Sequence, residues 1–217
     1  MDKKQLIEKI GENWLCMIIR GDTVADTEAV CDALYDGGAR LIEVAFTTPN
    51  VCEVIEYLKN KYGEEVVLSA GTVRKLDWAK EAVAAGADCI VAPGFDPEIV
   101  KYTVSQGKVS MPGCVTPTEI EAALAAGADI IKLFPAYPFG PEYVSYIHGP
   151  MPEARMAPAG KLTLDNMRDW YLGGAFCGVA GVTTEMKMDI AVKEKRWGDI
   201  TKAAAHWLQL VADLKKL

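Results

Sequence analysis

The chain has 217 residues, half of them hydrophobic, which is enough for a single domain with a sizeable core. Its net charge of -7, with no cluster of Lys and Arg beside aromatic residues, argues against a nucleic-acid groove and against binding to an anionic membrane. We therefore expect one domain over residues 1–217, with small molecules as its partners.

The first 14 residues have the spacing of a short amphipathic helix and lack the apolar centre of a signal peptide. No apolar run in the chain approaches the roughly 18 residues that a membrane-spanning helix needs. These features predict a cytoplasmic protein.

After this segment, apolar runs of strand length alternate with amphipathic stretches of helical spacing. The runs lie at about Leu15–Ile19, Leu41–Ala45, Val66–Ser69, Cys89–Val91, Val109–Met111, Ile130–Leu133, Arg155–Ala157 and Phe176–Ala180. The helical stretches include Thr23–Tyr35, Leu76–Ala85, Pro117–Ala126 and Thr163–Leu172. Four small-residue stops precede the next strand, where glycine supplies the left-handed residue that ends a helix. They are residues 37–40, 85–88, 126–129 and 173–176.

Continuous apolar strands are typical of a parallel sheet covered by helices, which predicts an α/β fold. Eight such strands in about 200 residues favour a single (β/α)8 TIM barrel with a short N-terminal helix. An open doubly wound sheet is the alternative, and the absence of Gly-x-Gly-x-x-Gly after the first strand counts against it.

Six cysteines are scattered singly, without a Cys-x-x-Cys pair, and we expect buried, reduced thiols. Of the two histidines, we expect His148 in a loop and His206 on the last helix. Neither is part of a His-x-His or His-Glu-x-x-His motif, so the sequence predicts no zinc site built from histidines.

Lys132 lies in the run 129–135, DIIKLFP, where its immediate neighbours are apolar. A buried ammonium is costly unless it is paired or neutralised, and burial lowers the pKa of a lysine. The free amine can then attack a ketone to form a Schiff base. The alternative is a lysine at a strand end whose charge reaches water or a partner carboxylate.

Glu43, like Lys132, is a charged residue with apolar neighbours, in the run Leu41–Phe46. In a barrel both side chains would lie near the carboxyl ends of the strands, where burial raises a carboxyl pKa and lowers an amine pKa. Such a pair can exchange protons near neutral pH. The alternative is an ion pair that only joins two strands.

Further candidates follow the other strands, at the end of the barrel where catalytic residues gather. In chain order they are Arg20, Thr47, Gly71, Thr72, Pro93, Phe134, Gly160, Lys161, Gly181 and Thr183. We expect these residues to bind the substrate.

Five segments resemble the 2-keto-3-deoxy-6-phosphogluconate and 4-hydroxy-2-oxoglutarate aldolases, a family of class I pyruvate aldolases. These segments are IEVAFTTP at 42–49, AGTV at 70–73, VAPGF at 91–95, MPGCVTP at 111–117 and IKLFPA at 131–136. They occur in the order of the family and extend over much of the region from 42 to 136.

The resemblance implies an aldolase without metal or cofactor that cleaves a 2-keto-3-deoxy sugar acid of the 6-phosphogluconate type, or 4-hydroxy-2-oxoglutarate. The products would be pyruvate and glyceraldehyde 3-phosphate or glyoxylate. Lys132 would form the Schiff base and Glu43 would carry protons, while Thr72 and the Gly71 backbone would hold the carboxylate. Thr47 stands where some members have arginine, so we infer that Arg20 shares this role. The resemblance also implies a homotrimer.

Two segments depart from the family pattern. Relatives show Pro-Thr-Gly-Gly, a phosphate-binding turn, where this chain has Pro158-Ala159-Gly160-Lys161, and Gly-Ser where it has Gly181-Val182-Thr183. Lys161 could meet a phosphate or a carboxylate, or it could be a solvated residue. The sequence therefore leaves open whether the substrate is phosphorylated.

The segment from Glu185 to Asp199 is predicted to form a loop or short helix over the barrel mouth. Two rival functions also remain at this point. One is a phosphate-sugar isomerase or epimerase on the same barrel, and the other is a non-catalytic barrel that binds a small acid.

Overall fold

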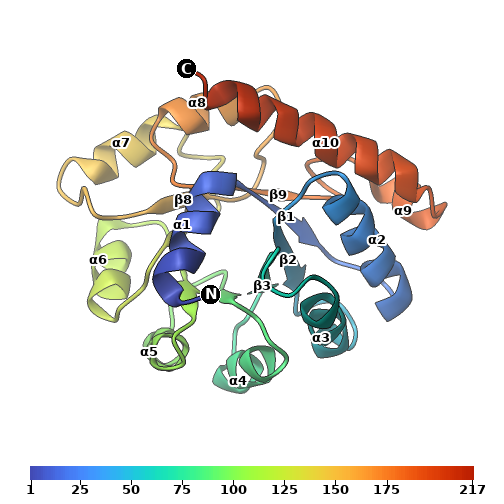
Figure 1. Cartoon of the computed structure of the whole chain (residues 1–217). Helices are drawn as coiled ribbons and strands as arrows, with labels where there is room; N and C mark the ends of the chain where they lie inside the picture. Colours follow the sequence, from blue (N-terminus) through green and yellow to red (C-terminus); the bar gives the residue numbers. More distant parts are fainter.

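Parallel strands alternate with helices through the computed structural model, which describes residues 1–217 (Figure 1). The strands are β1 (Leu15–Ile19), β2 (Leu41–Ala45), β3 (Val67–Gly71), β4 (Cys89–Val91), β5 (Val109–Met111), β6 (Gly113–Cys114), β7 (Ile131–Leu133), β8 (Met156–Pro158) and β9 (Gly178–Gly181). The helices are α1 (Lys3–Asn13), α2 (Val24–Asp36), α3 (Val51–Tyr62), α4 (Leu76–Ala84), α5 (Pro97–Ser105), α6 (Pro117–Ala125), α7 (Glu142–His148), α8 (Met167–Leu172), α9 (Asp189–Lys193) and α10 (Trp197–Leu214).

The strands form a curled parallel sheet and a shorter second sheet. The larger has the order β5-β4-β3-β2-β1-β9, and the smaller has the order β6-β7-β8. Only Pro112 separates β5 from β6, and because proline has no backbone N–H it interrupts a strand. The predicted parallel α/β fold is confirmed, whereas strand pairing alone does not complete the predicted eight-stranded barrel.

Alternate residues of each strand point to opposite faces, and this separates two layers of packing. In β2, Ile42 and Val44 belong to the large apolar core between strands and helices. Leu41 and Ala45 belong to a second core of 16 residues on the inner face of the strands. Glu43 lies between these two residues in sequence and so shares their inward direction.

Helix α1 closes the amino ends of the strands. Figure 1 shows it lying across that end, with the other helices around the outside and α10 beside α2. Its side chains Leu6 and Ile10 belong to the inner core, together with strand residues such as Val67. A capping box at Asp2 and Gln5 fixes the start of the helix. The predicted N-terminal helix is therefore part of this inner core.

The four predicted helix stops are confirmed. Gly38, Gly86, Gly127 and Gly174 have φ values of 99°, 100°, 100° and 91°, a region that glycine adopts without steric cost. One predicted helix is too long, because residues 163–166 form a turn in which the Asn166 side chain accepts the Thr163 N–H at 2.8 Å. That helix begins at Met167.

His148 is the last residue of α7, and its predicted position in a loop is wrong. Glycine and proline follow it directly, and the helix ends there. His206 lies on α10 as predicted. The segment 185–199 contains the short helix α9, in line with the expectation of a loop or short helix.

All six cysteines are free, and all except Cys52 are buried. Burial raises the pKa of the Cys177 and Cys114 thiols to about 12, so both stay protonated near neutral pH. The expectation of buried, reduced thiols is thus confirmed for five of the six. None of the helices combines the length and the apolar character required to span a membrane.

Candidate active site

Lys132 and Glu43 meet on the inner face of the sheet. Lys132 belongs to β7 and Glu43 to β2, and their side chains are 6% and 1% exposed. The distance from Lys132 Nζ to Glu43 Oε1 is 3.8 Å, which is longer than a hydrogen bond. Neither Glu43 oxygen has a hydrogen-bond partner within the chain.

Burying a carboxylate without hydrogen bonds costs folding free energy, so this pair is not expected to stabilise the fold by joining two strands. The same arrangement suits a reacting pair, because the carboxylate can accept a proton from a group that enters beside the amine. The geometry therefore favours a chemical role for both side chains over the purely structural alternative.

Gly71 makes room for the Glu43 carboxylate. It pairs with Ala45 across β2 and β3, and a Cβ added to it would lie 2.0 Å from Glu43 Oε1. No residue with a side chain fits there without moving the acid. Sequence patterns placed Gly71 in the substrate-binding set, and the structure places it beneath Glu43 and outside the cavity lining.

The next residue, Thr72, has a φ of 60°, which costs energy for any residue except glycine. This conformation ends β3 and places Thr72 in the wall of a cavity at the carboxyl ends of the strands. The strain is typical of residues that a functional site holds in position.

This cavity has a volume of about 300 Å³, which suits a small organic acid. Its lining contains seven of the predicted site residues, together with five that are outside the predicted set. The predicted ones are Arg20, Thr72, Pro93, Lys132, Phe134, Gly160 and Gly181. The others are Ile18, Ala159, Val179, Thr184 and Glu185.

Three other candidates lie outside the cavity wall. Thr47 is exposed in the turn after β2, and its neighbour Thr48 is buried and accepts the Gly21 N–H at 3.2 Å. Thr183 is partly buried. Lys161 has its ammonium 3.8 Å from the centre of the Tyr137 ring. Binding roles for these residues stay predictions.

Arg20 lines the cavity and forms no ion pair within the chain. The Phe134 ring lies 5.6 Å from Lys132 Nζ, measured to the ring centre. The ring therefore forms part of the cavity wall next to the lysine.

Glu185 is the residue that sequence reasoning missed. Its Oε1 accepts the Lys161 N–H at 3.0 Å and its Oε2 accepts the Gly181 N–H at 2.9 Å, and the Thr184 hydroxyl also donates to Oε2. Burial alone would raise its pKa, but these hydrogen bonds outweigh that effect and hold the pKa below its ordinary value. The carboxylate is therefore charged near neutral pH.

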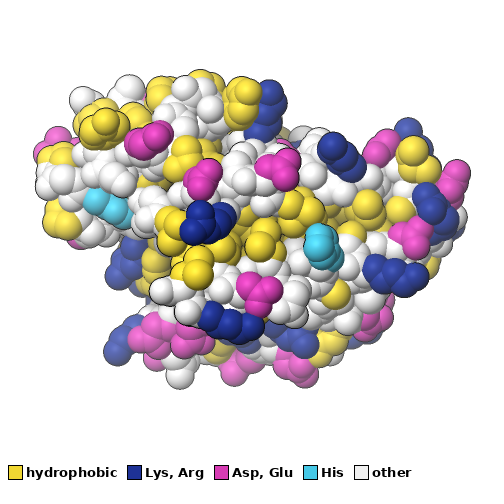
Figure 2. Space-filling view, turned by 90° about the horizontal axis from the view of Figure 1, so that it is seen from above, with side chains coloured by type: hydrophobic (Ala, Val, Ile, Leu, Met, Phe, Trp, Pro, Cys, Tyr) yellow, Lys and Arg dark blue, Asp and Glu magenta, His cyan; other side chains and the backbone are white.

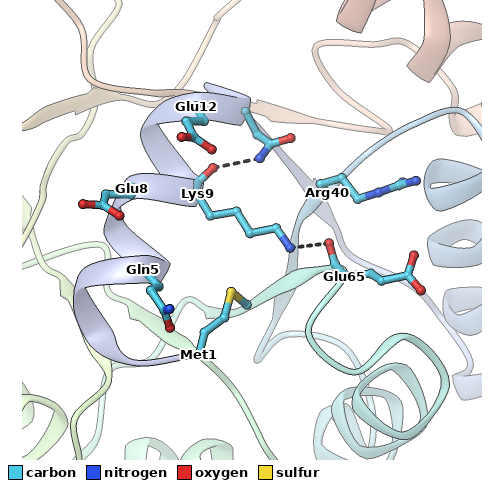
Figure 3. A pocket seen from close by; sticks show the side chains of 8 residues that line it. Met1, Gln5, Glu8, Lys9, Glu12, Arg40 and Glu65 are labelled. Atoms are coloured by element: carbon cyan, nitrogen blue, oxygen red, sulfur yellow. Dashed lines mark hydrogen bonds between the residues drawn. The ribbon is translucent and has the colours of Figure 1, made fainter.

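A larger hollow lies elsewhere on the molecule. Its volume is about 530 Å³, and it is lined by α1, Arg40 and Glu65 at the amino ends of the strands (Figure 3). Lys9 crosses it and donates to the Glu65 carbonyl at 2.7 Å. The smaller cavity is the better candidate for chemistry, because Lys132 lines it and the hollow does not contain this residue. Glu43 lies behind the cavity wall, in contact with Lys132. No group of three or more His, Cys, Asp or Glu side chains is arranged to hold a metal ion.

Comparisons with known proteins find relatives that are named as aldolases. The 2-dehydro-3-deoxy-6-phosphogalactonate aldolase of Escherichia coli is 31% identical over 173 residues, covering 79% of this chain and 83% of the relative. The 2-dehydro-3-deoxy-phosphogluconate aldolase of Treponema pallidum is 31% identical over 195 residues, covering 89% and 91%. These relatives are aldolases, and this chain is an enzyme of the same lyase class.

A solved structure supports the fold. The KDPG aldolase of Legionella pneumophila, with pyruvate captured at low pH as a covalent carbinolamine, matches with a TM-score of 0.84 and 24% identity. The match covers 95% of this chain and 98% of that one. The model of the KDPG and KHG aldolase family matches residues 6–203. The chain therefore belongs to the KDPG and KHG aldolase family.

Proposed function

We propose that this protein is a class I aldolase that cleaves a 2-keto-3-deoxy sugar acid, or 4-hydroxy-2-oxoglutarate, to pyruvate and an aldehyde. The observation that carries the proposal is the buried pair, with Lys132 Nζ 3.8 Å from Glu43 Oε1 beside a cavity of suitable size. Membership of the family and the names of the relatives support the same reaction class.

Substrate binding uses the residues at the carboxyl ends of β1 and β3. Arg20 and Thr72 hold the carboxylate next to the ketone, because a guanidinium and a hydroxyl both donate to carboxylate oxygens. This places the C2 carbonyl beside Lys132. The unprotonated amine attacks C2 to form a carbinolamine, and the loss of water gives a protonated imine.

Cleavage then needs one base. Glu43 takes the proton of the C4 hydroxyl as the C3–C4 bond breaks, and the electron pair of that bond moves into the imine. The aldehyde leaves, and an enamine of pyruvate remains on Lys132. Protonation at C3 and addition of water to the imine release pyruvate and restore the free amine.

Trapping with borohydride tests the proposal. Borohydride reduces an imine to a stable amine, so incubation with pyruvate should add one reduced pyruvyl group to the protein. Peptide mass mapping should locate the added group at Lys132. The variant Lys132→Ala should take up none, and Lys101→Ala, which removes an exposed lysine from α5, should behave as the parent protein.

An adduct confined to Lys132 supports the aldolase. A folded protein that gives no adduct at any pyruvate concentration overturns it, and leaves the isomerase class or a non-catalytic barrel that binds a small acid. An adduct that persists in Lys132→Ala would move the chemistry to another lysine.

We also propose that the two sheets are parts of one closed (β/α)8 barrel. Three observations support closure. Pro112 alone separates β5 from β6, its carbonyl accepts the Lys132 N–H at 2.9 Å, and a parallel bridge joins Ala159 after β8 to Val179 in β9. The first two connect the end of β5 to the smaller sheet through Pro112, and the third connects the end of the smaller sheet to β9.

We further propose a homotrimer, as in the family that the chain resembles. Large apolar side chains are exposed on α7, α8 and α9, where Tyr146 is 76%, Leu172 54% and Ile190 57% exposed. Figure 2, seen from above relative to Figure 1, shows apolar side chains gathered between charged groups on one face of the molecule. Exposed apolar area of this kind is typical of subunit contacts.

A further inference from the structure

The carboxylate of Glu185 occupies a corner of the candidate active site that is built to receive an anion. Two backbone N–H groups, from Lys161 after β8 and Gly181 at the end of β9, point at its two oxygens at 3.0 and 2.9 Å. Converging backbone N–H groups of this kind bind phosphate and carboxylate groups. Here the chain supplies the anion itself.

The backbone at this corner is shaped around the carboxylate. A Cβ added to Gly181 would lie 2.6 Å from Glu185 Oε2 and 2.3 Å from Thr184 Oγ1, so only glycine fits beneath the acid. Gly160 and Lys161 have φ values of 90° and 59°, and this turn presents the Lys161 N–H. Two successive left-handed residues, one of them not glycine, are costly, and the bond to Glu185 helps to stabilise them.

The charges along the cavity wall leave no cation for a second anion of the substrate. Lys132 is the proposed nucleophile, and Arg20 is assigned to the carboxylate beside the ketone. The ammonium of Lys161 lies over the Tyr137 ring, and Lys161 does not line the cavity. The end of the site opposite the ketone therefore carries a negative charge from Glu185 alone.

From these contacts we infer that Glu185 sets the specificity of the site for a substrate whose far end is an uncharged hydroxyl group. This inference rests on the proposed aldolase function and selects an unphosphorylated 2-keto-3-deoxy sugar acid. The terminal hydroxyl donates to Glu185, whereas a terminal phosphate meets a like charge and finds both N–H groups already bonded. 4-Hydroxy-2-oxoglutarate is disfavoured as well, because its far end is a second carboxylate.

Two substrates that differ only in the terminal group test the inference. We would measure kcat/KM for 2-keto-3-deoxygluconate and for its 6-phosphate ester with the parent protein and with Glu185→Gln. The parent should prefer the free sugar acid. Glu185→Gln keeps the size of the side chain and removes its charge, so it should shift the ratio toward the phosphate ester by at least about tenfold.

Glu194→Gln is the matched control, since it removes one charge from an exposed residue next to α9 and should leave the ratio unchanged. A parent protein that prefers the phosphate ester overturns the inference, and so does a ratio that Glu185→Gln does not change. If Glu185→Gln does not fold, the parent's own preference still decides. Borohydride trapping of pyruvate at Lys132 does not involve the terminal group, so it separates failure of this inference from failure of the aldolase proposal.

Discussion

At the scale of single residues, the candidate site brings together one amine and one acid from strands that are not neighbours in a sheet. Lys132 and Glu43 are almost completely buried, and the carboxylate lacks the hydrogen bonds that such groups normally make. An unpartnered buried carboxylate is unfavourable for stability, and the proposed reaction, in which Glu43 acts as a base, would give this arrangement a use.

Gly71 should be as necessary as the acid that it supports. In Gly71→Ala the new methyl carbon would lie only 2.0 Å from Glu43 Oε1. The carboxylate must therefore move away from its present position beside Lys132. We expect kcat/KM for aldol cleavage to fall by about 100-fold, because a displacement near 1 Å has effects of this order. Strain from the extra methyl should cost about 1–3 kcal/mol of unfolding free energy.

Gly198→Ala provides the control, because a Cβ at Gly198 meets no atom within 4 Å. Activity assays and urea unfolding of both variants would check the prediction. A Gly71→Ala protein with the activity of the parent would show that Glu43 does not need its present position.

The sequence identified Lys132 and Glu43 because a charged residue among apolar neighbours in a strand is unusual and visible without coordinates. The same pattern could not identify Glu185, which lies among charged and polar residues after β9. Its importance comes from backbone N–H groups of two segments that the fold brings together. Side chains in loops, such as Thr47 and Lys161, were predicted from their place after a strand, and position alone does not fix their direction.

At the scale of elements, a polar cluster joins the outer helices α2 and α3. Asp32 on α2 accepts hydrogen bonds from Tyr57, Lys61 and Tyr62 on α3, at 2.9, 2.6 and 2.5 Å. Burial by itself would raise the pKa of Asp32, and the bonds from Lys61 and the two tyrosines lower it overall below the ordinary value of 3.8.

The sign of the pH dependence follows from this lowered pKa. The stabilisation is complete above the pKa of the unfolded chain, near 3.8, and is lost as the pH falls through the lower pKa of the folded state. We expect Asp32→Asn to lose about 1 kcal/mol of unfolding free energy at pH 7. The difference from the parent should shrink as the pH falls below about 4.

Urea unfolding at several pH values would measure this difference, with Asp77→Asn as a control for an exposed ion pair. Asp77 contacts Lys80 at 3.1 Å and is 81% exposed, so its loss should change stability by less than about 0.5 kcal/mol. If the difference in unfolding free energy between Asp32→Asn and the parent protein stays constant from pH 7 to below pH 4, the charge of Asp32 does not have the stabilising role described here.

Strand positions were predictable because buried parallel strands are short apolar runs between glycine stops. The division of β5 from β6 at Pro112 was not predicted, although the proline was a visible signal, since a residue without N–H interrupts a ladder. The start of α8 was missed because Thr163 and Asn166 form a local side-chain bond that competes with the helix.

At the scale of the whole molecule, chemistry and stability are placed at opposite ends of the strands. The cavity with Lys132 lies at the carboxyl ends, while α1 closes the amino ends. Leu6 of α1 is 1% exposed and packs into the inner core. The alternation of strands and helices predicted a site at the carboxyl ends of the strands. It did not predict how deeply α1 is buried in the core at the amino ends.

Leu6→Ala should therefore reduce stability and leave the chemistry intact. Truncation of a fully buried leucine removes apolar contacts and leaves a cavity, so we expect a loss of about 2–5 kcal/mol. The variant should keep the kcat/KM of the parent at temperatures where it is folded. Leu217→Ala is the control, because this side chain is 76% exposed and its truncation should have little effect on the free energy of unfolding. Equal losses in the two variants would show that α1 is not part of the core.

The most direct measurement of the central claim is the exchange of the methyl hydrogens of pyruvate in D₂O, followed by proton NMR. Formation of the imine on Lys132 and removal of a C3 proton give the enamine, and its return to imine introduces deuterium, without any aldehyde being present. We predict rapid loss of the methyl signal with the parent protein, no enzymatic exchange with Lys132→Ala, and a rate reduced by about 100-fold or more with Glu43→Gln. Exchange that continues at the parent rate in either variant would contradict the account, as would a folded parent protein that catalyses none.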